Sequence, residues 1–322
     1  MNPIVEPVTL DAIRAAAERC GDIAIRTPML TCDIPSATGA RVHLKLENLQ
    51  PIGAFKARSV SNIVLSRPRD TLRDGLYTAS SGNSALAMSW MAKRLGLAAT
   101  ALVPEGAPEA KLAPIRSLGG KVELLTYQQW WDVIVSAGCQ DQSGCYIDAV
   151  RDPAALAGNG TIGLEILDQL ADCDAVFAPF GGGGLISGIG CAIKALRPDI
   201  RLVGCELVSA SPLGAALTAG RPVEVPFEVG FVSGVGVGSV LPEMWPLLRS
   251  LVDEVVTVSL ADVTRMIGQV ALSHHVIVEG AGAITIAAAL NGQHGYKNVC
   301  AVVSGGNLDA AILADILTGR RP

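Results

Sequence analysis

The chain has 322 residues, of which 50% are hydrophobic and 17% are charged, and its formal net charge is −5. This length and composition suit one large or two moderate globular domains with a sizeable core. The acidic balance without a basic run argues against nucleic acid or a membrane as a partner, and an aromatic content of 4% argues against a base-stacking surface.

The cysteines and the N-terminal residues bear on location. Eight cysteines are scattered along the chain without a CxxC pair, which favours reduced, buried thiols and a cytoplasmic location over a disulfide framework or a zinc site. The N-terminal residues do not resemble a signal peptide. The longest uncharged stretch, residues 175–193, contains Pro179 and four consecutive glycines, so it suits a strand, a loop and a helix better than a membrane span.

The first half of the chain alternates between predicted strands and helices. A helix is predicted for residues 10–20, with Thr9 as its cap. Residues 42–47 alternate between apolar and polar side chains as in a half-buried strand, and a helix is predicted for 57–65. Beyond Gly75, strands are predicted at 76–79, 99–103, 122–125 and 145–147, and helices at 84–95, 108–118 and 128–137.

A second series of alternating elements starts near Asp152. Its predicted strands are 175–178, 201–205, 255–258 and 298–303, its helices are 161–170, 186–196, 211–218, 260–273, 281–290 and 308–317, and a glycine-rich irregular segment covers 230–238. Short strands alternating with helices of about ten residues indicate an α/β fold with parallel sheets covered by helices on both faces. Without a low-complexity linker between the two series, we expect two closely packed domains, with a cleft where strand ends converge.

The first residue that suggests chemistry is Lys56, which follows the turn formers Pro51 and Gly53 and the aromatic ring of Phe55. A lysine in this position is also compatible with an ordinary solvated side chain. Three later turns rich in Gly, Ser or Asn, each predicted between a strand and a helix, favour a functional role.

The first of these turns comprises Ser80, Ser81, Gly82, Asn83 and Ser84. Hydroxyls, an amide and backbone N–H groups at a helix N-terminus form an anion site that suits a carboxylate. The alternative is plain helix capping, for which one serine is enough.

The second turn comprises Gly181, Gly182, Gly183, Gly184 and Leu185. The N–H groups of such a loop, at the positive end of a helix dipole, suit a phosphate. The loop lacks the GxGxxG spacing of a dinucleotide site and the GK[ST] of a triphosphate loop, which favours a monophosphate. A purely structural tight turn is the alternative.

The third turn comprises Ser304, Gly305, Gly306 and Asn307. Its hydroxyl suits a hydrogen bond to a heteroaromatic nitrogen, and the alternative is a turn with a helix cap. A lysine, a monophosphate cradle, a carboxylate site and a hydroxyl for a ring nitrogen together fit pyridoxal 5'-phosphate with an amino-acid substrate.

These segments resemble the threonine/serine dehydratase and serine racemase family of fold-type II pyridoxal-phosphate enzymes. The resemblance covers nearly the whole chain and includes residues 45–56, 80–84, 108–112, 159–165, 181–185, 278–282 and 304–307. It implies a tryptophan synthase β-like fold of two open twisted parallel-sheet domains, with the cofactor in the cleft between them. Residues 1–74 with 151–322 would form the large cofactor-binding domain, and residues 75–150 the small domain with the substrate loop.

The resemblance also implies a role for each matching position. Lys56 would be the Schiff-base lysine and the base at Cα, and Phe55 would lie beside the cofactor ring. The other implied contacts are Asn83 with the cofactor 3-hydroxyl, residues 80–84 with the substrate carboxylate, residues 181–185 with the phosphate, and Ser304 with the pyridine nitrogen.

The implied reaction converts a β-hydroxy amino acid to a 2-oxo acid and ammonia by α,β-elimination. The substrate would be L-threonine, L-serine or a β-substituted analogue. Ser81 matches the second base of the racemases, so a racemase that uses Lys56 and Ser81 as two opposed bases is the alternative. A homodimer or homotetramer is expected from the apolar composition and the mean hydropathy of +0.41.

Three positions depart from the family pattern. Ala54 replaces the usual serine before Phe55 and Lys56. Ser84 stands where histidine or methionine is common, which changes the wall of the substrate pocket. Glu206 and the Ala210 carbonyl match two ligands of the family's site for Mg²⁺ or a monovalent cation, but Pro212 replaces the acidic third ligand.

Overall fold

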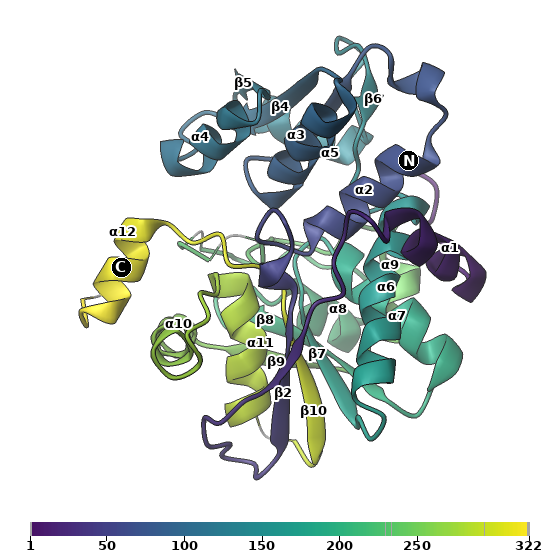
Figure 1. Ribbon diagram of the computed structural model, residues 1–322. Coiled ribbons are helices and arrows are strands. Elements are labelled where there is room, and N and C mark those ends of the chain that lie inside the picture. Colours follow the sequence, from purple (N-terminus) through teal and green to yellow (C-terminus); the bar gives the residue numbers. More distant parts are fainter. Residues whose placement is uncertain (1, 229, 233, 293, 321–322) are drawn as a thin grey trace.

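The strands of the chain form two sheets of unequal size. The computed structural model describes residues 2–228, 230–232, 234–292 and 294–320. In these residues the larger sheet contains, in spatial order, β1 (Met29–Thr31), β2 (Arg41–Leu46), β10 (Asn298–Val303), β7 (Ala175–Pro179), β8 (Arg201–Leu207) and β9 (Glu254–Val258). The smaller sheet contains β5 (Lys121–Leu125), β4 (Ala99–Pro104), β3 (Leu76–Ala79) and β6 (Cys145–Tyr146). Only β1 and β2 pair in antiparallel fashion among these strands, which confirms the prediction of two parallel-sheet α/β domains (Figure 1).

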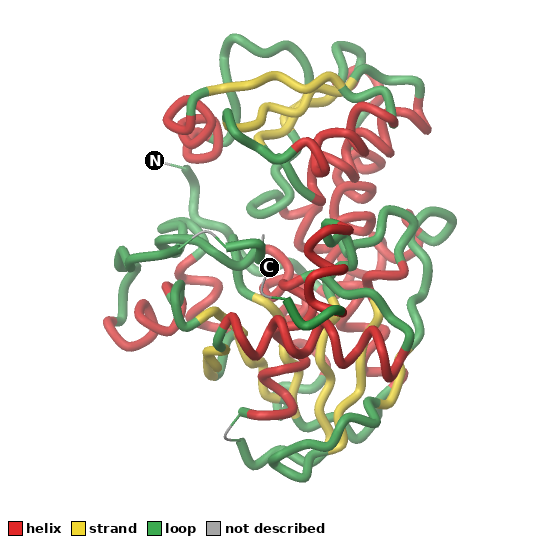
Figure 2. The backbone as a smooth tube through the Cα atoms, turned by 90° about the vertical axis from the view of Figure 1, so that its left-hand side faces the viewer, coloured by secondary structure: helices red, strands yellow, loops and turns green. Residues whose placement is uncertain are grey.

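The large domain buries its sheet between two layers of helices (Figures 1 and 2). One layer contains α10 (Leu260–His274) and α11 (Gly280–Asn291), and the other contains α1 (Leu10–Cys20), α6 (Pro153–Gln169), α7 (Gly184–Leu196) and α9 (Trp245–Leu251). Each layer encloses its own hydrophobic cluster. The central strand β7 is therefore buried along its whole length, which explains its continuous apolar sequence.

The small domain carries α3 (Asn83–Leu95), α4 (Glu109–Ser117) and α5 (Tyr127–Ser136) on its sheet. One helix, α2 (Lys56–Ser66), packs against α3 on one side and against α6 on the other. Eight consecutive α2 residues are buried, because helices of both domains cover it. Helix α2 therefore lies at the junction of the two domains (Figure 1). Lys56 is its first residue.

The helix predicted for residues 161–170 is α6, and its predicted start was wrong by eight residues. The helix begins at Pro153, where Asp152 accepts a hydrogen bond from the Ala154 N–H at 2.8 Å. The first half of α6 contains glycines, which have a low helix propensity. They are needed for close packing, because a Cβ at Gly158 would lie 2.7 Å from the backbone carbonyl of Arg58.

The other predicted elements begin and end within two residues of their observed bounds. They include α8 (Pro212–Ala219) and α12 (Ala310–Leu317), whereas the short helix α9 was not predicted. The irregular segment 230–238 contains neither helix nor strand in its described residues, and Ser233 lies outside them.

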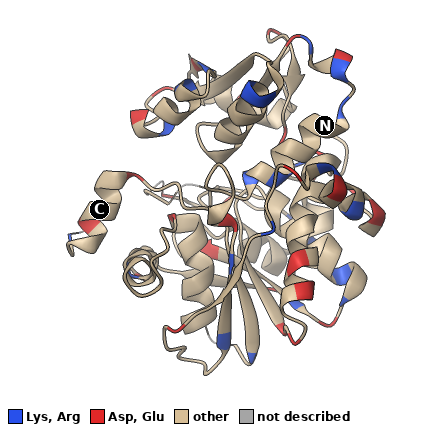
Figure 3. Cartoon of the chain, viewed as in Figure 1, with Lys and Arg blue, Asp and Glu red and all other residues tan. Residues whose placement is uncertain are grey.

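The surface and the thiols complete the description of the fold. Figure 3 shows lysines and arginines interspersed with acidic residues over both domains. None of the helices in the described part of the chain has the length and apolar composition that crossing a membrane requires. All eight cysteines are free, and those of the large sheet, Cys205 in β8 and Cys300 in β10, are fully buried.

Candidate active site

Lys56 is held in place at the first turn of α2. Its ammonium donates a hydrogen bond to the Ala149 carbonyl at 3.0 Å and lies 4.9 Å from the centre of the Phe55 ring. The side chain is half-buried. Desolvation lowers the pKa of Lys56 to about 8, and the Asp148 carboxylate opposes this effect. Roughly a tenth of this amine is therefore neutral at pH 7 and available as a nucleophile or a base.

The turn before Lys56 is joined to the turn that contains Ser304. The Phe55 N–H donates to the Ser304 carbonyl at 2.9 Å, and the Gly306 N–H donates to the Gly53 carbonyl at 2.9 Å. Gly53 has φ of +73°, a conformation that side chains other than glycine rarely adopt. The Ser304 hydroxyl is buried and has no hydrogen-bond partner among the described residues.

The turn at residues 80–84 meets the same region through the Asn83 side chain. The Asn83 amide nitrogen donates to the Glu279 carboxylate at 2.9 Å, and its oxygen accepts from the Asn307 amide at 2.8 Å. The Asn307 amide also donates to the Ile52 carbonyl at 2.9 Å. These bonds bring together three of the predicted segments, which lie far apart in the sequence.

Glu279 was missed as a site residue by the sequence reasoning, although it lies in one of the quoted family segments. It precedes α11, and its side chain is almost fully buried. Burial raises the pKa of Glu279 to about 7, while the hydrogen bond from Asn83 and the charge of Lys111 oppose the shift. A buried carboxyl with such a raised pKa beside Asn83 is a candidate functional group.

The N-terminus of α3 is open to an anion. Gly82 is its N-cap and provides no side-chain hydrogen bond, so no serine of the described turn caps the helix. The Ser80 hydroxyl instead accepts from the Gly82 N–H at 3.2 Å. Ser81 and Ser84 are half-exposed. The first-turn N–H groups of α3 are therefore available to a carboxylate.

The glycine loop ends at the N-terminus of α7. Gly183 is the N-cap with φ of +92°, and it provides no side-chain hydrogen bond to the helix. The helix begins at Gly184, two residues earlier than predicted. A Cβ at Gly181 would lie 2.0 Å from the Gly234 carbonyl oxygen, so the backbone is packed too closely for a side chain. Uncapped N–H groups at the positive end of a helix dipole suit a phosphate.

A short segment, residues 148–151, connects Lys56 with the glycine loop. Its Ala149 carbonyl accepts the hydrogen bond from Lys56, as described above. Val150 of this segment packs against the glycine loop. A Cβ added at Gly182 would lie 2.9 Å from the Val150 side chain, and a Cβ added at Gly184 would lie 2.9 Å from the Val150 carbonyl oxygen. The fourth predicted segment is thereby placed beside the other three.

Comparison with known proteins identifies the family. Residues 22–305 match the family model described as pyridoxal-phosphate dependent enzyme. The chain belongs to this family. It is 37% identical to an L-threonine ammonia-lyase of Geobacter sulfurreducens over 87% of this chain and 70% of that protein. It is 35% identical to a serine racemase of Arabidopsis thaliana over 94% of both chains. The structure of maize serine racemase superimposes with a TM-score of 0.87 and 28% identity over 98% of both chains. The resemblance stated from the sequence is thus confirmed.

The residues of this pyridoxal-phosphate dependent enzyme fit the cofactor. The unpartnered, buried Ser304 hydroxyl is the orphaned polar atom that a pyridine nitrogen would satisfy. The uncapped N-terminus of α7 provides donors for the phosphate, and Lys56 provides the amine. Bound pyridoxal phosphate would therefore satisfy groups that otherwise lack partners.

The environment of Glu206 differs from that of a typical cation ligand. Its carboxylate accepts hydrogen bonds from the Ser211 hydroxyl at 2.7 Å and from the N–H groups of Leu213 at 2.8 Å and Gly214 at 3.0 Å. Glu206 therefore caps the N-terminus of α8. In the described chain, no three His, Cys, Asp or Glu side chains are grouped to hold a metal. A cation at Glu206 and Ala210 remains a prediction.

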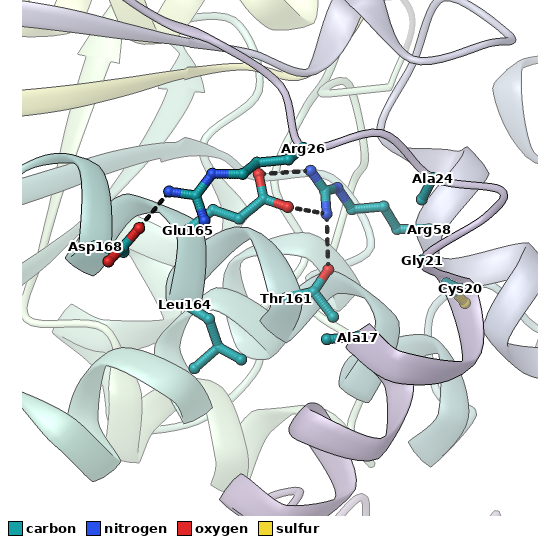
Figure 4. A pocket seen from close by; sticks show the side chains of 10 residues that line it. All are labelled: Ala17, Cys20, Gly21, Ala24, Arg26, Arg58, Thr161, Leu164, Glu165 and Asp168. Carbon is teal, nitrogen blue, oxygen red and sulfur yellow. Dashed lines mark hydrogen bonds and ion pairs between the residues drawn. The ribbon is translucent and has the colours of Figure 1, made fainter.

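A separate cavity of about 410 Å³ is not the active site of this enzyme (Figure 4). Its lining includes Arg58 and Glu165 but no residue of the four turns at 51–56, 80–84, 181–185 and 304–307. The Arg58 guanidinium is already bonded to Glu165 at 2.7 Å and to Glu47 at 2.8 Å, and Arg26 pairs with Asp168. The charges around this cavity are thus neutralised by one another.

Proposed function

We propose that this enzyme is a dehydratase, or ammonia-lyase, acting on a β-hydroxy amino acid. The substrate is L-threonine, L-serine or a β-substituted analogue, and the products are a 2-oxo acid and ammonia. The observation that carries the proposal is Lys56, whose pKa is lowered to about 8 and whose ammonium bonds a backbone carbonyl rather than a carboxylate. Relatives named as threonine ammonia-lyases support this reaction class.

The chain's residues have separate tasks in this proposal. Pyridoxal phosphate, when bound, supplies an electron sink for the charge that develops at Cα. Lys56 holds the cofactor and removes the Cα proton, for which a pKa near the working pH is favourable. Phe55 would lie beside the cofactor ring, and Asn83 would bond its 3-hydroxyl. The phosphate would be held by the N–H groups of Gly181, Gly182, Gly183, Gly184 and Leu185.

Two further groups control the ring nitrogen and the substrate. The Ser304 hydroxyl would bond the pyridine nitrogen, and a hydroxyl, unlike a carboxylate, would not hold that nitrogen protonated. Ser80, Ser81, Gly82, Asn83 and Ser84 bind the substrate carboxylate at the open N-terminus of α3.

The decisive experiment compares wild type with Lys56→Ala and the exposed-lysine control Lys297→Ala. Wild type and Lys297→Ala are expected to show the absorbance band of a covalently bound cofactor and to release 2-oxo acid and ammonia. Lys56→Ala is expected to lose both. A panel of β-hydroxy amino acids with each configuration at Cα and Cβ then identifies the substrate. Undiminished oxo-acid production by Lys56→Ala would refute the proposal.

A second candidate is an amino-acid racemase in which Lys56 and Ser81 act as two opposed bases. The observation that favours it is that Ser81 does not cap α3 and stays half-exposed. Relatives named serine racemase are also similar over most of the chain. Chiral chromatography after incubation with one enantiomer decides the matter. Ser81→Ala should abolish racemisation and spare elimination, and racemisation by Ser81→Ala would exclude this role.

We also propose the domain boundaries and the assembly. Residues 75–150 form the small domain, and 1–74 with 151–322 form the large one, since β3 to β6 lie within 76–146. A homodimer or homotetramer is supported by α12, which is rich in apolar residues and has no buried residue. Light scattering of the purified protein tests the assembly. A cytoplasmic location is supported by the eight free thiols.

A further inference from the structure

We propose that Arg151 is a positioning residue that fastens residues 148–151 against Lys56 and ties this segment to the position of the small domain. The inference deepens the proposed function, because it concerns the setting of the same lysine. Arg151 itself contacts neither Lys56 nor the glycine loop in the described hydrogen bonds.

The Arg151 guanidinium is buried and bonded on three sides. Its Nε donates to the Asp148 carboxylate at 2.6 Å, and one terminal nitrogen donates to Glu243 at 2.7 Å. The other terminal nitrogen donates to the Ile134 carbonyl. An arginine with this many directed bonds defines one geometry, because its planar fork fits only one arrangement of acceptors.

Asp148 connects Arg151 to the Ala149 carbonyl, which accepts the hydrogen bond from Lys56. Its carboxylate accepts from the N–H groups of Val150 and Arg151, both at 3.0 Å, while its second oxygen accepts from the guanidinium. These bonds fold the segment into a tight turn that directs the Ala149 carbonyl to Lys56 at 3.0 Å. The same turn presses Val150 against the glycine loop.

The hydrogen bond from Arg151 to the Ile134 carbonyl connects the arginine to helix α5 of the small domain. Ile134 lies in the last turn of α5, whose C-terminal end attracts a cation, and its carbonyl also accepts from the N–H of the C-cap residue Ala137 at 3.3 Å. Glu243 belongs to the large domain and precedes α9. Arg151 therefore spans the two domains, and a shift of the small domain must break its bonds or displace residues 148–151. The Lys56 acceptor and the wall of the glycine loop would then move with them.

The test uses the holoenzyme of Arg151→Gln, Arg151→Lys and the matched control Arg67→Gln. Arg67 pairs with Asp152, the neighbour of Arg151, but it is half-exposed and does not contact residues 148–151 in the described bonds. Arg151→Gln is expected to lower kcat roughly 10- to 100-fold with little change in KM, as for a misplaced catalytic group. It is also expected to raise the Kd for pyridoxal phosphate and to shift the pH midpoint of cofactor attachment.

Two further results separate positioning from a general loss of stability. Glu243→Gln should show a smaller effect of the same kind, and the double variant should be no worse than Arg151→Gln, because both act through one contact network. Arg151→Lys should recover only part of the activity, since it lacks the fork. A lowered Tm with unchanged kcat, cofactor Kd and pH midpoint in Arg151→Gln and Glu243→Gln overturns the inference. Wild type without turnover or cofactor band would instead overturn the proposed function.

Discussion

The Asn83 amide nitrogen lies 2.9 and 3.2 Å from the two oxygens of the Glu279 carboxylate. Since the Asn83 oxygen accepts from Asn307, the orientation of this amide is determined from both sides. Glu279 and Asn307 thus position a residue that we assign to the 3-hydroxyl, and Glu279 does so with a carboxyl that titrates near neutral pH.

Glu279 should make the stability of the cofactor-free protein depend on pH. Its pKa is raised from 4.5 to about 7, so the folded state retains a proton that the unfolded state releases earlier. The associated stability is present below pH 4.5 and is lost as the pH rises through 7. In Glu279→Gln this loss should disappear, which makes the variant more stable than wild type at pH 8 by roughly 3 kcal/mol.

Urea denaturation of the cofactor-free protein at pH 5 and pH 8 measures this difference. The exposed residue Glu18 provides the control Glu18→Gln, which should keep the wild-type pH dependence. If Glu279→Gln loses stability between these pH values as steeply as wild type, Glu279 is not the group responsible.

The lowered pKa of Lys56 should govern the attachment of pyridoxal phosphate. Only the neutral amine attacks an aldehyde, so the rate of covalent attachment should rise with pH around a midpoint of about 8 rather than 10.5. Asp148→Asn should move this midpoint to lower pH, because the Asp148 charge raises the pKa of Lys56. Borohydride trapping followed by mass spectrometry gives the rate, and a wild-type midpoint near 10.5 would contradict the prediction.

The glycine loop should tolerate no side chain at Gly181. A Cβ there would lie 2.0 Å from the Gly234 carbonyl oxygen, so one of two backbone segments must move. At a strain of about 1–3 kcal/mol, the Kd for pyridoxal phosphate should rise roughly tenfold to a hundredfold. Titration of cofactor-free Gly181→Ala with pyridoxal phosphate measures this Kd. Gly295→Ala, which has no atom within 4 Å of the added Cβ, should bind as wild type does.

A buried ion cluster should contribute more to stability than the surface pair beside it. Arg58 bonds Glu165, as Figure 4 shows, and it also bonds Glu47. Lys45 also pairs with Glu165, so two charges of each sign are balanced in the interior. Glu47→Gln leaves a buried positive charge uncompensated and should lower the free energy of unfolding by about 3–5 kcal/mol. Asp168→Asn, which breaks the exposed pair with Arg26, should lower it by less than about 1 kcal/mol.

Urea denaturation of both variants at one pH provides the comparison. A loss in Glu47→Gln no larger than that in Asp168→Asn would show that the cluster does not depend on its charge balance.

Most of the fold and the four chemical segments were predictable because they depend on local patterns. Strand-to-helix turns mark the ends of parallel strands, and such ends converge where ligands bind. The start of α6 was not predictable, because Gly158 serves a contact with the backbone of α2 that no local pattern reveals. A helix-destabilising glycine can be required by packing.

The residues that support the site could not be found in this way. Glu279 and Asn83 are 196 residues apart, and Arg151 and Glu243 are 92 apart, so their pairing follows only from how the domains dock. Each of these four residues is a single charged or amide side chain, and no sequence motif links it to its partner. The family segment at 278–282 included Glu279, but its sequence alone did not indicate that the carboxyl would be buried beside Asn83.

Alkylation of the buried free thiols can report when the large sheet opens. Burial raises the pKa of the Cys205 and Cys300 thiols well above its usual range, so neither reacts with an alkylating reagent while the large sheet is closed. Cys145 is half-exposed at the edge of the small sheet. Mass-spectrometric timing of alkylation at Cys300, with the half-exposed Cys145 as the reference thiol that needs no opening, therefore reports opening of the large sheet, with no label added to the protein.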